Sequence, residues 1–197
     1  MFLPYRKTAL AALLAAGLLA CRRDHPPRPA PAAHIAQSEK AVLPAAVALP
    51  LNPPKGTARV ATYYATGVQQ YKAREKAGSS PVAYEWALVA PKADLYDATN
   101  KKVGFHGAGP FWTVGGDSLF AQHFSPARTA PSPDGGSIDW LLLQPKAGTT
   151  PQGRFAAVAY IQRIATRGGK PPAAPPVQAE QTVDVPYEAV YRFSKNN

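Results

Sequence analysis

The sequence predicts an all-β domain, an antiparallel sandwich or barrel of about 8–10 short strands. From Thr57 onward, short runs rich in Val, Ile, Tyr and Thr alternate with Gly and Pro turns, a pattern typical of strands and hairpins. No segment of this region carries the sustained apolar stripe of an amphipathic helix. Cys21 is the only cysteine, so the domain has no internal disulfide and needs an apolar core.

Each strand is expected where an apolar or β-branched run lies between turn residues. The expected strands cover residues 59–74, 82–89, 93–96, 102–106, 111–114, 118–124, 138–144, 154–164 and 182–193. Pro91 is expected to end the second strand, and Gly67 to mark a bulge or bend in the first. Residues 97–101 and 115–117 are expected to be hairpin turns, and the Pro- and Gly-rich residues 125–137 an irregular loop. The alanines of 154–164 also permit a helix, although its Tyr, Val and Ile favour a strand.

The N-terminus has the features of an export signal. Arg6 and Lys7 precede a short apolar run over residues 8–20 that ends at Cys21, as in a secretory signal peptide. Residues 18–21, Leu-Leu-Ala-Cys, resemble the lipobox of bacterial lipoproteins, which predicts lipidation of Cys21 and a membrane anchor at the cell envelope. The alternatives are an ordinary secretory signal, giving a secreted or periplasmic protein, and an uncleaved signal anchor, although the run is shorter than the roughly 20 residues that span a bilayer.

The expected organisation is a signal peptide over residues 1–20, a Pro/Ala-rich flexible tether over 21–43 and a single β domain over 44–197. The tether is rich in proline and alanine, a composition that favours extended polyproline geometry over a packed core.

The net charge of +10 does not indicate a nucleic-acid partner. From Thr57 onward, 15 Lys and Arg face 10 Asp and Glu, a net charge of +5. These charges are spread singly rather than in basic runs, as expected of a solvated surface.

Six phrases of the domain, in the same order, resemble the bacterial and fungal family known as domain of unknown function 3455. They begin at Gly67 (GVQQY), at Tyr84 (YEW, followed by APKADLYD), at His106 (HGAGPFW), at Ile138 (IDWLLL), at Ile161 (IQRIATRGG) and at Val185 (VPY). The resemblance covers about residues 44–194 and implies an exported protein without an established activity. Family members often carry cysteines where this chain has Ala73 and residues 173–177, so a disulfide bond that those cysteines could form is absent here. Some fungal members are labelled malate dehydrogenase, but Gly104, Gly107 and Gly109 lack the spacing of a dinucleotide site.

His106 and Trp112 are the first candidate site residues. His106 lies beside two glycines, where a backbone can approach a ligand closely, and Trp112 follows. His106 is either a general base or hydrogen-bond donor at a pocket mouth walled by Trp112, or a strand-end histidine bonded to a loop carbonyl.

Trp140, Gln162 and Arg163 are the remaining ligand-binding candidates. Gln162 and Arg163 are neighbours on one expected strand, so one side chain points inward and the other outward. The inward one needs polar partners, and Asp139 or Glu85 could serve Arg163 as an ion pair instead of an external anion. Trp140 is either a core residue or a stacking surface.

The sequence shows no nucleophile elbow, no zinc-ligand spacing and no cofactor motif, so we expect neither a metal nor a cofactor. The first hypothesis is a non-enzymatic envelope lipoprotein whose β domain binds a small molecule, glycan or protein. The second is an enzyme using His106 as acid or base and Arg163 as an anion clamp, and the third is a structural protein without a site. A carboxylate beside His106 would favour the enzyme, and a groove lined by Trp112 and tyrosines would favour binding. A His106 fully buried against main-chain carbonyls would deprive both hypotheses of their main residue.

Overall fold

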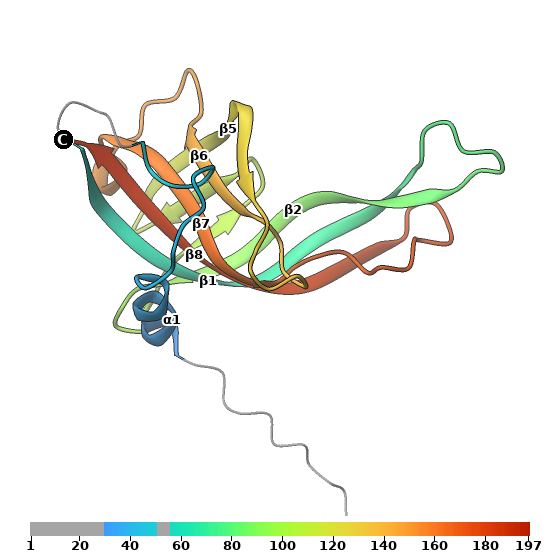
Figure 1. Ribbon diagram of the computed structural model, residues 1–197, viewed down its shortest axis with the longest axis horizontal. Helices are drawn as coiled ribbons and strands as arrows, with labels where there is room; N and C mark the ends of the chain where they lie inside the picture. Colours follow the sequence, from blue (N-terminus) through green and yellow to red (C-terminus); the bar gives the residue numbers. More distant parts are fainter. Residues whose placement is uncertain (1–29, 51–55) are drawn as a thin grey trace, which may run out of the picture.

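The computed structural model describes residues 30–50 and 56–197, and its core is a closed antiparallel barrel of eight strands (Figure 1). Each strand pairs with the next in sequence, and the last pairs with the first. The strands are β1 Thr57–Glu75, β2 Tyr84–Tyr96, β3 Lys102–Gly107, β4 Phe111–Val114, β5 Asp117–Ala130, β6 Trp140–Pro145, β7 Val158–Gly168 and β8 Thr182–Asn196. The all-β prediction is confirmed, and of its two forms the barrel is the one observed.

Three strands continue beyond the barrel as an arm, made of residues 68–75 of β1, 84–92 of β2 and 182–186 of β8 (Figure 1). The prediction that Pro91 ends a strand is wrong, because β2 runs through it. β3 pairs only with residues 93–96 of β2, so Pro91 lies on an edge segment where a missing N–H is tolerated. Pro186 likewise lies just beyond Tyr187, where the pairing of β7 with β8 stops.

Two other boundaries differ from the predictions. β5 extends to Ala130 through the expected loop, and residues 124–127, which include Pro126, make no pairing with β6. The strand expected over 154–164 begins only at Val158, after a 3₁₀ turn (η1, Gly153–Phe155) that buries Phe155. β1 has its extra residue at Val60 rather than at Gly67, and the irregularity opposite residues 70 and 71 is an extra residue of β2. A Cβ at Gly67 would clash with the carbonyl of Lys92, so this glycine serves the close approach of β1 and β2.

Inward-facing side chains fill one end of the barrel with an aromatic core. The ring of Phe193 lies 5.2 Å from Phe155, 5.8 Å from Tyr63 and 5.5 Å from Trp112, measured between ring centroids. Edge-to-face and tilted contacts of this kind add to the apolar area that the rings bury.

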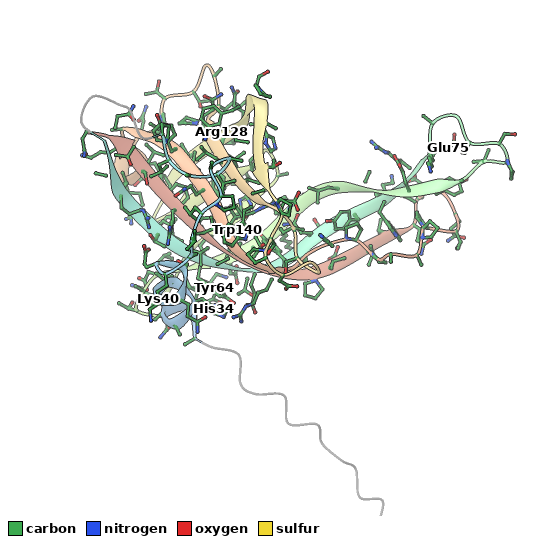
Figure 2. All side chains as sticks on the ribbon, viewed as in Figure 1. His34, Lys40, Tyr64, Glu75, Arg128 and Trp140 are labelled. Atoms are coloured by element: carbon green, nitrogen blue, oxygen red, sulfur yellow. The ribbon has the colours of Figure 1, made fainter. Side chains whose placement is uncertain are left out.

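The part of the expected tether that the structure describes is not extended: α1 (Pro31–Ser38) is helical. A helix of this length is marginal in isolation, and packing explains why it forms. Ile35 and Val47 are buried with Tyr64, Trp140 and Leu142 against the outside of the barrel. We call this face, covered by α1 and residues 41–49, the outer wall; Figure 2 shows His34, Tyr64 and Trp140 on it.

The predicted signal peptide and Cys21 lie outside the described residues. Within the described ranges, no helix has the length and apolar character needed to cross a bilayer.

Candidate functional site

A cavity of about 500 Å³ lies at the end of the barrel next to the arm, opposite the aromatic core. Its size is that of a small-molecule site. Every strand contributes at least one lining residue: Gln69, Leu88, His106, Trp112, His123, Leu141, Arg163 and Tyr191. The cavity is therefore built by closure of the barrel.

His106 forms part of the cavity wall and is buried in an aromatic sandwich. Its ring stacks on Trp112, its cross-strand partner, at 4.6 Å and 6°, and lies 4.8 Å from Tyr191 between centroids. The Nδ1 atom lies 2.7 Å from the carbonyl oxygen of Phe111. Because a carbonyl only accepts, Nδ1 carries the proton and Nε2 is left as an acceptor.

The protonation state of His106 follows from its surroundings. The pKa of His106 is lowered to about 4. Burial is the main cause, the Phe111 carbonyl acts in the opposite direction, and the positive charge of Arg163 adds a smaller downward effect. His106 is therefore neutral at pH 7.

Arg163 supplies positive charge to the cavity. Its Nε and Nη2 atoms donate to the main-chain carbonyl of Asp139, at 3.1 and 2.8 Å. The expected ion pairs are not observed: Glu85 pairs with Arg74 instead, and Asp139 meets Arg163 only through its carbonyl. Leu141, Arg163 and Tyr191 are successive cross-strand partners on β6, β7 and β8.

Two buried donors of the cavity lining, Gln69 Nε2 and Trp112 Nε1, have no hydrogen-bond partner among the described residues. The hydroxyl of Tyr191 interacts with the hydroxyl of Tyr187 and with Arg163; burial raises the pKa of both tyrosines, whereas the charge of Arg163 lowers it. Buried polar groups are normally satisfied, and the outer wall also contains unpaired buried atoms. What sets the two donors apart is that they belong to residues that line a cavity.

The structure brings together three of the five candidates, His106, Trp112 and Arg163, and places Gln162 and Trp140 elsewhere. Gln162 points outward and is nevertheless only 1% exposed, because residues 44–48 cover it and its Nε2 donates to the carbonyl of Val47 at 2.7 Å. Trp140 is buried in the outer wall.

Sequence reasoning did not find four residues that line the cavity: Gln69, His123, Lys170 and Tyr191. The alternation of β1 places Gln69 on the same face as Gly67 and Tyr71, which was a usable signal. Lys170 lies two residues beyond the end of β7 at Gly168, and its contribution depends on the tertiary fold.

The family model described as "Protein of unknown function (DUF3455)" matches residues 53–195. The chain belongs to the DUF3455 family. The match confirms the resemblance and contains all the cavity-lining residues. No curated protein and no solved structure matches the chain significantly.

Two further features of this DUF3455 chain concern metal ligands and the contacts of the arm. No three His, Cys, Asp or Glu side chains come together as a possible metal site within residues 30–50 and 56–197. Ala73 pairs with Trp86, whose indole Nε1 donates to the carbonyl of Ala174 at 3.0 Å. This side-chain hydrogen bond links the arm to the 170–181 loop.

Proposed function

We propose that this protein is an exported, lipid-anchored binding protein that holds a small molecule in the cavity of its β barrel. The observation that carries the proposal is the cavity itself, which combines aromatic walls, a cation and unpaired buried donors. Ligand sites usually have this composition, mostly apolar with a few convergent polar groups.

The surroundings of His106 favour binding over acid–base catalysis. A general base works best with a pKa near the operating pH, and the pKa of His106 is about 4. Its partner is the carbonyl of Phe111, whereas the enzyme hypothesis called for a carboxylate. His106 is thus a buried histidine bonded to a main-chain carbonyl and stacked on Trp112, so the binding proposal rests on the cavity and on Arg163 rather than on His106.

A thermal-shift screen of the full chain tests the binding function. A ligand that binds only the folded state raises the melting temperature, and we expect such a shift to be lost in Arg163→Ala and reduced in His106→Ala. Arg154→Ala is the matched control, because Arg154 pairs with Asp117 away from the cavity. Hits that persist in all three variants, or the lack of any hit, would contradict the proposal.

The anchor has a test of its own. We expect mass spectrometry of the mature protein to find a diacylglyceryl group on Cys21, and fractionation to place the chain with membranes. Cys21→Ser should move it to the soluble fraction. An unmodified N-terminus would remove the anchor and leave the binding function standing.

A further inference from the structure

We infer that the cavity binds an organic anion with an apolar body, such as an aromatic carboxylate. The anionic group lies at Arg163 and the apolar body lies against Leu88 and Val89. The inference rests on the proposed function, since it names the class of molecule that the cavity takes.

The first argument is charge. Five of the seven arginines in the described chain pair with a carboxylate, whereas Arg128 and Arg163 have none within 4.0 Å. Arg128 donates to three main-chain carbonyls outside the cavity, and Arg163 lines the cavity. Lys170, a second cation of the lining, donates to the carbonyl of Gly135. Asp139 is the acidic residue of the lining, so two cations face one exposed carboxylate while His106 is neutral.

The second argument is the excess of donors. Gln69 Nε2 and Trp112 Nε1 are buried donors without a hydrogen-bond partner among the described residues, and the guanidinium of Arg163 lies in the same lining with a main-chain carbonyl, not a carboxylate, as its acceptor. A carboxylate offers two oxygens that only accept hydrogen bonds, and bonds to a guanidinium are the stronger, charge-assisted kind. An anionic group is therefore the complement of this set.

The third argument is the apolar rim on β2. Leu88 and Val89 are 54% and 60% exposed, although both line the cavity. Neighbours on a strand normally point to opposite faces, but Tyr71 pairs with Leu88 and Gln70 with Ala90, so Val89 is the extra residue of a β-bulge. Bulges redirect side chains and are common beside binding sites. Here the bulge lets two adjacent apolar side chains face the same ligand.

Calorimetric titration of the full chain with three probes of one shape tests the inference. Naphthoate, the neutral naphthamide and cationic naphthylmethylammonium share an aromatic body and differ in the head group. We expect naphthoate to bind about tenfold more tightly than naphthamide, the effect of one charge-assisted contact, and the cation to bind more weakly than either.

The variants separate the contribution of the ligand's charged head group to affinity from that of its apolar body. Arg163→Gln should abolish most of the preference for naphthoate, and Arg154→Gln, the same change at an arginine outside the cavity, should leave it intact. Leu88→Ser should weaken naphthoate and naphthamide by the same factor. If Arg163→Gln does not fold, Arg163→Lys keeps the charge and should retain part of the preference.

The outcomes distinguish this inference from the proposed function. Equal binding of naphthoate and naphthamide, or a preference that survives Arg163→Gln, overturns the anion while the cavity remains a binding site. Screening hits that are all neutral or cationic do the same. The absence of any ligand in both experiments overturns the two together.

Discussion

The outer wall and the cavity both hold charged side chains, but only those of the outer wall have a counter-ion in the described chain. On the outer wall, Arg192 donates to the carbonyl of Ser38 at 2.6 Å and pairs with Glu39 at 3.1 Å, and His34 lies 3.5 Å from Glu188. In the cavity, Arg163 donates to a main-chain carbonyl and has no carboxylate within 4.0 Å among the described residues.

The difference separates residues that attach α1 to the barrel from residues that are available to bind a ligand. A buried charge that has its partner within the chain contributes to a fixed arrangement, here the attachment of α1 to the barrel. A cation and donors without partners cost stability, and such a cost is typical of sites shaped for a ligand. The comparison therefore predicts that changes in the outer wall alter stability and changes in the cavity alter binding.

The largest effect is expected for Leu142→Ala in the outer wall. Leu142 is fully buried, so the change should lower the free energy of unfolding by about 3 kcal/mol and leave ligand binding intact. Leu88→Ala at the exposed cavity rim should change stability by less than about 0.5 kcal/mol and weaken binding. Urea unfolding and titration measure both; equal destabilisation by the two changes would break the comparison.

Acid should destabilise the cavity through His106. Its pKa of about 4 in the folded chain is below the ordinary value near 6.5, so between these values the unfolded chain binds more protons and stability falls with falling pH. From pH 7 to pH 5 the expected loss is about 2 kcal/mol. His106→Asn, which keeps a donor for Phe111, should remove that part of the pH dependence. Parallel stability curves for the two proteins would rule out a buried neutral histidine.

Arg192, which is buried, and Arg163, which is partly exposed, should differ when each is replaced by methionine. Arg192→Met loses charge-assisted hydrogen bonds to α1 and should cost about 1.5 kcal/mol. Arg163→Met removes a cation without a counter-ion and should stay within about 0.5 kcal/mol of the wild type. Chemical denaturation of both variants decides this, and a larger loss for Arg163→Met would make Arg163 a structural residue.

The smallest expected effect is the electrostatic influence of Arg163 on the pKa of His106. Because its charge lowers the pKa of His106, Arg163→Met should raise that pKa. An NMR titration of the imidazole resonances measures the change, with Arg154→Met as the control. An unaltered titration would show that the guanidinium does not act on His106.

Local patterns predicted most of the fold, because strands and tight turns depend on neighbouring residues. The turn at residues 97–101 forms as expected, with Asp97 Oδ1 accepting from the main-chain N–H groups of Thr99 and Lys101. Pro91 misled, since a proline interrupts a strand only where the strand has neighbours on both sides, and this part of β2 has a neighbour on one side. α1 could not be predicted, because the barrel surface that stabilises it is assembled from distant segments.

The candidate site was predicted in part for the same reason. Strand alternation correctly places Gln162 and Arg163 on opposite faces, but it does not show which face borders a cavity. The outward face is also buried, because residues 44–48 cover Gln162. Polarity next to aromatic residues found His106, Trp112 and Arg163, whereas Trp140 has the same local character and lies in the outer wall.

The arm leaves residues 84–92 of β2 with a strand on one side only. An open strand edge is a template for copies of the same chain to join end to end, and prolines are one of the ways in which proteins prevent this. Pro91 and Pro186 each remove a donor from the arm. We therefore expect the two prolines to oppose edge-to-edge pairing of the projection that carries Leu88 and Val89 to the cavity rim.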